Sequence, residues 1–537
     1  MSPQNALART GPLGDRRLQA ARSLLGPLFA PLDFLLAGGG DTRLAVDPET
    51  GLNGYGCRPF PRPEAFTFAS STATSISDHA YAAAGAAREA LVAATIAREG
   101  AFDARIEAMR ARLLALLGLA GSGTEIVFTP SGTDAQLQAL FLVQTFLGGP
   151  LTSIVVAADE TGSGTGFAVT GRHFNTCTAL GHNVLKGDAL AGMGDVTRMD
   201  ISVCDESGRV RSLDETDRDV IAAVQSAVCN GRKVLLQTMD RSKLWRRAPS
   251  QGCVREIQAR WPNAVQVVVD ACQMRASPER IRSYLGRGEM VLVTGSKFFT
   301  GPPFSGALLV PAFLSAQFCG DVRIPRGLCD YSNASDWPPR WHSICAQLPD
   351  TCNVGQWLRW EAALAEMETY FDVPQSFRDK ALQRFGATAS HLIGAGGLDL
   401  LDEDPCDASD SIDDREFTTR TILPFLVRRG GKPLTRPAAA GIYRALNCDV
   451  SGLLPPGATA LERLVAAQLC HIGQPVAVRD ADGMETAMLR ISAGARILSE
   501  SWCVDGAVAQ HNLDCECEQA RLIVEKIGLL LRYQIVV

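Results

Sequence analysis

Lys297 lies in a loop whose side chains could hold an aldehyde through a Schiff base. The loop follows the apolar run at residues 290–293, and the hydroxyls of Thr294 and Ser296 flank the lysine. A lysine that forms a Schiff base needs a lowered pKa, which burial supplies, and neighbours that bind phosphate without pairing with the amine. Alternatively, Lys297 is a solvated residue at the end of a strand, so residues elsewhere in the chain have to decide between the two interpretations.

A helix start predicted at residues 131–133 is the second candidate site. Ser131, Gly132 and Thr133 follow a β-rich run at residues 125–129 and open an apolar helical stretch. The free amides and the dipole of a helix N-terminus bind phosphate groups. The same residues would also make an ordinary Ser/Thr helix cap, which needs no ligand.

Asp270 is the third candidate, because it follows a hydrophobic run at residues 265–269. A carboxylate at the end of a buried strand is costly unless a cation or a strong donor faces it. Asp270 therefore predicts a partner such as a protonated ring nitrogen. A helix N-cap would be the alternative use of an aspartate at this position.

The candidates share one feature, which is that each follows a predicted strand. Short β-rich runs alternate with helical stretches in the middle of the chain, a pattern that indicates βαβ units and a mainly parallel sheet, hence an α/β fold. Ligands in such sheets bind at the carboxyl ends of the strands. The predicted strands are residues 125–129, 153–157, 233–237, 265–269, 290–293 and 307–310.

Composition and pattern divide the chain into three parts. Residues 1–78 include a Pro- and Gly-rich passage and predict an N-terminal arm and loop, and residues 78–119 predict one long helix. Residues 79–320 form the predicted large domain. Residues 321–537 form a smaller C-terminal domain, which begins with a Pro- and Trp-rich loop at residues 321–350.

Charge and composition exclude several classes of protein. A formal net charge of −6, with dispersed Lys and Arg, argues against a nucleic-acid surface. The 46% of hydrophobic residues can bury a large core, yet no run approaches the length of a membrane span. The 16 cysteines lack metal-type spacing, so we expect reduced thiols, no metal site and a cytoplasmic location.

Together these segments resemble the fold type I pyridoxal-phosphate (PLP) enzymes, and in particular the class V aminotransferase and cysteine desulfurase group. Ser-Gly-Thr before a helix, Asp-x-x-Gln after a strand and Thr-x-Ser-Lys after the next strand occur in the family's order, and Asp270 and Lys297 are 27 residues apart. The resemblance spans roughly residues 80–500. It implies PLP as the cofactor and a three-layer large domain with a mainly parallel sheet, followed by a smaller α/β domain.

The resemblance implies a role for each matching residue. Lys297 would carry the Schiff base and move the proton of an α-carbanion or quinonoid intermediate. Asp270 would keep the pyridine nitrogen protonated, and Gln273 would bond the phenolic oxygen. The cofactor-binding residues implied in this way are Ser131, Gly132, Thr133, Glu160, Thr161, Gln237, Asp270, Gln273, Thr294, Ser296, Lys297, Thr351 and Asn353.

Three further segments extend the resemblance. Residues 488–492 are similar to the family's C-terminal Arg-x-Ser strand, so Arg490 would bind the substrate carboxylate, unless it forms a structural ion pair. Residues 351–355 resemble a Gly-Thr-x-Asn element that reaches the cofactor of a second subunit, which implies a homodimer. Residues 53–77 are either an active-site loop, with Tyr55 as a substrate-binding candidate, or an arm that packs between subunits.

One departure from the family concerns the face of the cofactor ring. The family usually stacks a His or an aromatic ring there, but the matching strand end at residues 157–164 has none, so Glu160 or Thr161 would cover the ring. A polar residue beside the ring is also expected after the next predicted strand. The alternatives for it are Gln237, Thr238 and Asp240.

The function most in keeping with these residues is an aminotransferase-type PLP enzyme that acts on an amino acid. One alternative is a PLP-dependent lyase that catalyses β- or γ-elimination or replacement. It includes a cysteine desulfurase, for which Cys406 has the family's position, although the acidic residues around it would raise the thiol pKa. A different class would be a non-catalytic relative that acts as a binding protein. The presence of Lys297, Asp270 and Arg490 together argues against that class.

Overall fold

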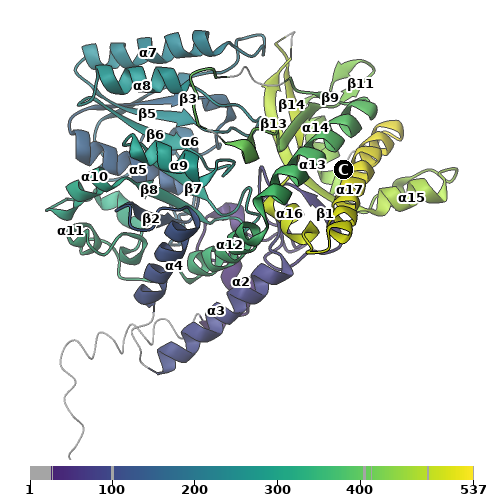
Figure 1. Ribbon diagram of the computed structural model, residues 1–537, viewed down its shortest axis with the longest axis horizontal. Helices are drawn as coiled ribbons and strands as arrows, with labels where there is room; N and C mark the ends of the chain where they lie inside the picture. Colours follow the sequence, from purple (N-terminus) through teal and green to yellow (C-terminus); the bar gives the residue numbers. More distant parts are fainter. Residues whose placement is uncertain are drawn as a thin grey trace, which may run out of the picture.

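Two large β-sheets organise the molecule, which is described by a computed structural model (Figure 1). The structure describes residue 26 and residues 28–97, 102–402, 407–412, 414–480 and 483–535. One sheet has seven strands and the other has five. The first sheet lies in the middle of the chain and the second is built mostly from its C-terminal part, as the sequence predicted for an α/β fold.

All six predicted strands lie in the seven-stranded sheet. β3, β4, β5, β6 and β7 pair in parallel, whereas β8 is antiparallel to both β7 and β2, so β2 runs in the common direction. The carboxyl ends of every strand except β8 therefore meet at one edge. In sheet order the strands are β2 (Glu125–Thr129), β8 (Gly306–Val310), β7 (Met290–Thr294), β6 (Val265–Asp270), β5 (Lys233–Met239), β3 (Leu151–Val156) and β4 (Val196–Ile201).

Strand β4 was not predicted from the sequence, and its position explains why. It is the edge strand next to β3, and the four residues in its middle are exposed. An edge strand with exposed side chains needs no apolar run, so its sequence lacks the usual signal.

Helices cover both faces of this sheet. Successive residues of a strand point to opposite faces, and the side chains on each face pack in a different hydrophobic cluster. Ile126 and Phe128 of β2 belong to one hydrophobic cluster, and Val127 between them belongs to another. The second cluster is built largely on α5 (Gly132–Leu147). The opposite face is covered by α7 (Leu213–Cys229), α8 (Gln251–Arg260) and α9 (Pro278–Gly286). The predicted three-layer arrangement is confirmed.

The predicted long helix at residues 78–119 is wrong, because the structure has two helices there. α3 (Asp78–Ile96) begins after Ser77, whose side chain accepts a hydrogen bond from the Ala80 amide, and α4 (Phe102–Leu116) follows it. The sequence between them contains Gly100, and glycine disfavours a helix interior by about 1 kcal/mol relative to alanine.

The second sheet recruits a strand from the N-terminal part of the chain. β1 (Ala65–Phe68) pairs in parallel with β13 (Leu469–Arg479), so residues 65–68 of the expected arm and loop lie in the C-terminal sheet. The order continues with β14 (Glu485–Ser492), β10 (Ile422–Leu426) and β9 (Asp399–Leu400), all antiparallel to their neighbours. The helices that pack on this sheet are α13 (Gln375–Ala395), α14 (Arg436–Leu446) and α17 (Gly506–Arg532).

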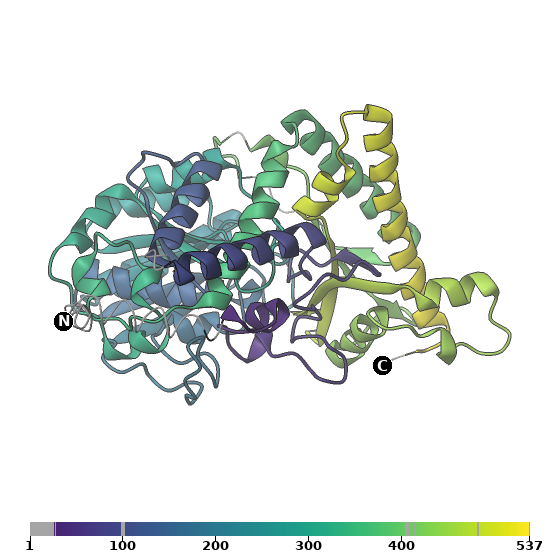
Figure 2. The same cartoon turned by 90° about the horizontal axis from the view of Figure 1, so that it is seen from below.

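Helix α12 (Val354–Asp372) connects the two halves near their junction (Figure 1, Figure 2). It packs against α2 (Leu32–Ala37), α3, α4 and α16 (Ala495–Ser501). Within the described residues, no helix is long and apolar enough to cross a bilayer. The remaining short elements are α6 (Thr165–Ala168), α10 (Ala312–Ser315), α11 (His342–Cys345), α15 (Ala460–Ala467), β11 (Arg428–Arg429) and β12 (Lys432–Pro433).

Candidate active site

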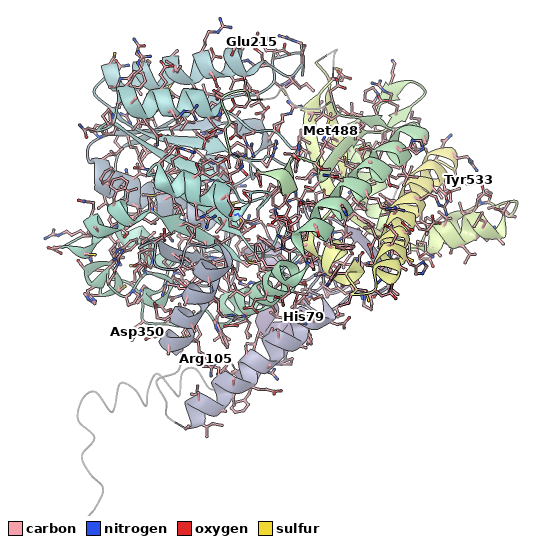
Figure 3. The ribbon with its side chains drawn as sticks, in the orientation of Figure 1. His79, Arg105, Glu215, Asp350, Met488 and Tyr533 are labelled. Atoms are coloured by element: carbon pink, nitrogen blue, oxygen red, sulfur yellow. The ribbon has the colours of Figure 1, made fainter. Side chains whose placement is uncertain are left out.

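The carboxyl edge of the large sheet brings the three sequence candidates together, and the second sheet adds a fourth. Asp270 ends β6, Lys297 follows β7 and Ser131 follows β2. Arg490 comes from β14, two residues after Met488, which Figure 3 marks on that strand. The candidate site therefore lies where the two sheets meet.

Lys297 is held by a main-chain carbonyl and has a lowered pKa. Its Nζ donates a hydrogen bond of 2.7 Å to the carbonyl oxygen of Thr72, and the pair is partly buried. Burial, together with the charges of Lys243 and Arg490, lowers the pKa of Lys297 to about 7. The lysine is thus not a freely solvated residue at a strand end, and much of it is a neutral amine at neutral pH.

Asp270 is a buried carboxylate whose side-chain partners are amides. Its Oδ2 accepts hydrogen bonds from Gln136 at 3.2 Å and Gln237 at 3.5 Å, and its Oδ1 accepts one from the Cys272 amide at 3.1 Å. Burial raises its pKa, while the nearby lysines act against that rise. The helix-cap interpretation is wrong, because the next helix begins at Pro278 and is capped by another residue.

The start of α5 has a side-chain cap and also lies beside an arginine. Ser131 caps the helix, and the carboxylate of Asp134 accepts a hydrogen bond from the Ser131 amide at 3.0 Å. Arg43 reaches this helix start from the N-terminal segment, with its Nη2 3.3 Å from Ser131 Oγ and its Nη1 3.5 Å from Thr133 Oγ1. Arg43 is paired with Asp41 at 2.6 Å. The Arg43 guanidinium and the free amides at the N-terminus of α5 therefore lie at the same site.

Gly132, the first residue of α5, is required by a close approach. A Cβ added at this position would lie 2.7 Å from the sulfur of Cys272, which is closer than real side chains come. The glycine thus lets the loop after β6 lie directly against the helix start, and it brings Asp270 and the α5 amides onto one site.

Arg490 is buried to 1% exposure and bonds to neutral oxygens. Its Nη2 donates to Thr72 Oγ1 at 2.9 Å and to the Gln474 carbonyl at 2.5 Å, and its Nη1 is 3.5 Å from the Lys243 carbonyl. Its Nε has no hydrogen-bond partner among the described residues. The structural ion pair considered for Arg490 is absent from these contacts. Burial lowers its pKa to about 10.

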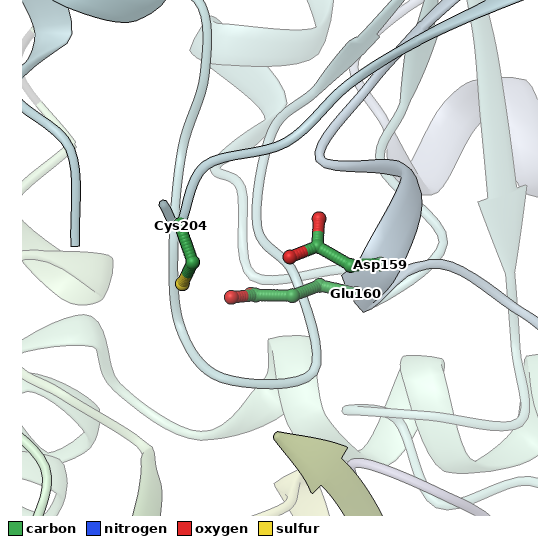
Figure 4. A group of neighbouring side chains, drawn as sticks. All are labelled: Asp159, Glu160 and Cys204. Carbon is green, nitrogen blue, oxygen red and sulfur yellow. The ribbon is translucent and has the colours of Figure 1, made fainter. Parts of the chain in front are cut away.

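The strand end at residues 157–164 supplies the carboxylate of Glu160, which already has partners within the protein. Glu160 forms an ion pair with Arg246 at 3.1 Å and accepts a hydrogen bond from Ser242. Figure 4 shows Glu160 beside Asp159 and Cys204, a group of oxygen and sulfur atoms that could hold a metal ion. Arg246 also bonds the Cys204 sulfur at 2.9 Å, so the guanidinium already provides the cation there.

Several of the other predicted side chains bond to the protein around the site. Thr161 directs its hydroxyl to the Ala158 carbonyl at 2.9 Å, and Thr294 directs its own to the Cys272 carbonyl at 2.7 Å. The side chain of Gln273 accepts from Arg275 at 3.0 Å and donates to the Ser71 carbonyl at 3.1 Å. Ser296 is buried on the loop that carries Lys297.

Of the three polar residues considered at the end of β5 or just after it, Gln237 is the one whose side chain bonds to Asp270. Asp240 instead accepts a hydrogen bond of 2.6 Å from Tyr284, and it pairs with Arg247 at 3.1 Å. The Oε1 of Gln237 has no partner among the described residues, so it is a free acceptor inside the protein.

Three other predicted residues have their contacts with other parts of the chain. Thr351 bonds to Asn333, and Asn353 donates to the Gly39 carbonyl at 3.0 Å, so both hold neighbouring chain. Tyr55 lies beside Arg43, and its ring centroid is 6.4 Å from that of Phe304. Cys406 lies outside the described residues.

Sequence reasoning missed four residues of this site. Arg43 and Thr72 come from a segment without strand or helix signals, and their contacts form only in three dimensions. Gln136 lies on the first turns of α5, and Lys243 lies four residues after the end of β5, whereas Asp270 is the last residue of β6. The rule that active residues follow strand ends, carried a few residues beyond Asp240, would have found Lys243.

No known family profile matches this chain, and no curated protein matches it. Its fold is similar to that of several solved structures. SPT with a PLP internal aldimine shares 14% identity over 97% of this chain and 99% of that chain, with a TM-score of 0.45. The cysteine desulfurase CsdA from Escherichia coli shares 14% identity over 85% of this chain and 95% of that chain, with a TM-score of 0.48.

A third similar structure is the ureidoglycine-glyoxylate aminotransferase from Bacillus subtilis. It shares 12% identity over 81% of this chain and 86% of that chain, with a TM-score of 0.44. All three TM-scores are below 0.5. A function for this protein therefore has to be inferred from its own residues and not from these similarities.

Proposed function

We propose that this protein is a PLP-dependent enzyme that acts on an amino acid, with amino transfer as its reaction. The observation that carries the proposal is Lys297, an amine whose pKa is lowered to about 7 and which is bound to a neutral carbonyl rather than a carboxylate. An amine in that state can attack an aldehyde at neutral pH. A lysine with a purely structural role does not need a lowered pKa.

The residues around Lys297 fit the cofactor. The carboxylate of Asp270 has amide partners and a raised pKa, so a ring N–H cation placed against it would be stabilised. Gln237 offers an unpartnered acceptor in the same place. The free amides of α5, with Ser131 and Arg43, suit a phosphate.

PLP, when bound, would supply an aldehyde and a ring that accepts electron density. The chain would supply the remaining functions. Lys297 would take and return the proton at the α carbon, because a pKa of about 7 lets its amine exist in both protonation states near neutral pH. Arg490, whose Nε is unpartnered, would bind the α-carboxylate of the substrate and orient it.

Elimination or replacement at the β or γ carbon is the alternative reaction, and it would use the same residues. The two reactions differ in their products, since amino transfer yields a keto acid and retains the nitrogen on the enzyme. Assays for keto acid, ammonia and sulfide across a panel of amino acids separate them.

Lys297→Ala tests the proposal directly. We expect the purified wild type to be yellow after incubation with PLP, and the variant to lose that absorbance, because the Schiff base would form on the Lys297 amine. Turnover should fall by roughly 10²–10⁴-fold or more, the range for a general acid-base group. The exposed Lys432 on β12 provides the matched control, Lys432→Ala, which should keep both colour and turnover. A colourless wild type that binds no PLP would contradict the proposal.

A further inference from the structure

A second lysine lies at the junction of the two sheets. The Nζ of Lys243 donates to the Thr161 carbonyl at 2.8 Å. Its own carbonyl is 3.5 Å from Nη1 of Arg490. The next residue, Leu244, packs with Val476 and Met488 of the second sheet, so the backbone of Lys243 is fixed against β13 and β14.

Cations outnumber carboxylates around this lysine. The charges of Arg490 and Arg43 act on Lys243, the charge of Lys243 acts on Lys297, and Arg490 and Arg275 also act on Lys297. Asp270 and Glu160 are the carboxylates that act on Lys243, and Glu160 is already paired with Arg246.

The buried arginines of this group bond to neutral oxygens. Arg275 bonds to Gln273, Ser70, Thr421 and the Ala493 carbonyl, and Arg490 bonds to Thr72 and to main-chain carbonyls. Buried charges without counter-ions are costly, and an anion that enters the site recovers that cost. The positive charge and the unpartnered Nε of Arg490 therefore indicate anionic ligands.

Two of these anions follow from the proposed function. The cofactor phosphate would lie at the start of α5, next to Arg43, and the α-carboxylate of the substrate would lie at Arg490. Lys243 remains. Burial and Arg490 lower its pKa to about 8, so its amine is still mostly protonated at neutral pH. Its partner is a carbonyl, which a flexible four-carbon stem can exchange for a ligand.

We propose that Lys243 binds a second acidic group of the substrate, so that the site takes a dicarboxylic amino acid or one with a comparable anionic side chain. The inference rests on the proposed function for the identity of the substrate, but the anion subsite itself does not require it. Lys243 would be a specificity-determining residue, held beside Arg490 by the contacts of Leu244.

The test compares succinate with butyrate, which have the same number of carbons and differ by one carboxylate. Calorimetric titration of the PLP-loaded protein and of the protein without PLP measures both affinities. We expect succinate to bind roughly tenfold more tightly or better, as one added charge-assisted contact predicts. Lys243→Met should remove that preference while butyrate binding stays within about twofold, and Lys243→Arg should restore it.

Each outcome separates the subsite from the proposed function. Equal binding of succinate and butyrate to the wild type overturns the subsite, even if the protein is yellow. A preference for succinate in a protein that binds no PLP supports the subsite and overturns the proposed function. If Lys243→Met weakens PLP more than it weakens pyridoxal, and leaves the succinate preference unchanged, then Lys243 binds the cofactor phosphate and the proposal is wrong.

Discussion

Lys297 and Lys243 are two buried amines with lowered pKa values, and the charge of Lys243 contributes to the shift of Lys297. Lys297 has a pKa of about 7 and Lys243 one of about 8, and burial is the largest cause for both. Arg490 and Arg275 push the pKa of Lys297 in the same direction, and Cys272 opposes them. The pKa of the Lys297 amine is therefore set by residues from both sheets.

The rate of PLP uptake by the ligand-free protein should follow the protonation of Lys297. We expect it to rise with pH through about 7 and to level off above that, because the neutral amine is the nucleophile. Lys243→Met removes a neighbouring positive charge, so the midpoint should move to higher pH. Stopped-flow absorbance measures both curves. An unchanged midpoint in Lys243→Met, with Lys432→Met as the surface control, would show that the two amines are not coupled.

The same pKa shift affects stability. The unfolded chain binds the Lys297 proton up to about pH 10.5, and the folded ligand-free protein releases it near pH 7. Over that window the unfolded state holds more protons, so this group makes the free energy of unfolding rise with pH. Lys297→Met should therefore stabilise the ligand-free protein more at pH 6 than at pH 10, as measured by chemical denaturation. A stabilisation that is equal at both pH values would contradict the shift.

At the scale of elements, the contact between the start of α5 and the loop after β6 brings Ser131 and Asp270 together. The close approach of Gly132 to Cys272 makes this contact possible. A side chain at position 132 would change the distance between the helix amides and the carboxylate, both of which the cofactor would contact.

Gly132→Ala should destabilise the protein by ~1–3 kcal/mol, the cost of overpacking, and should weaken PLP binding. The added Cβ would lie 2.7 Å from the Cys272 sulfur. Combining it with Cys272→Ala removes that sulfur and should restore most of both losses. Denaturant unfolding and PLP titration measure them. Gly286→Ala is the control, since an added Cβ there meets nothing within 4 Å. If the double variant is no better than Gly132→Ala, the steric explanation fails.

At the scale of the whole molecule, Arg275 joins three distant segments. Its guanidinium bonds to Gln273 after β6, to Ser70 after β1, and to Thr421 and the Ala493 carbonyl beside the second sheet. The large sheet, the N-terminal segment and the C-terminal sheet therefore share one buried cation. The predicted homodimer involves surfaces beyond these contacts and stays a prediction.

Arg275→Met should lower stability by roughly 3–5 kcal/mol, because the buried oxygens that it bonds lose their donor. We expect the single thermal transition of the wild type to broaden or split, as the two sheets lose their shared contact. Differential scanning calorimetry measures both effects. Arg436→Met breaks an exposed ion pair with Glu485 and should change stability by only ~0–1 kcal/mol. A sharp transition at the wild-type midpoint would show that Arg275 does not couple the halves.

Strand periodicity and strand-end residues were sufficient to predict the α/β fold, six of the strands in the large sheet, and the grouping of Ser131, Asp270 and Lys297. These are local patterns, and parallel strands bring their carboxyl ends to one edge whatever the rest of the chain does. Arg43, Thr72, Lys243 and the neutral partners of Arg490 depended on the tertiary structure. They come from segments far apart in the sequence, and only the packing of the N-terminal segment and the second sheet against the first sheet brings them to this site.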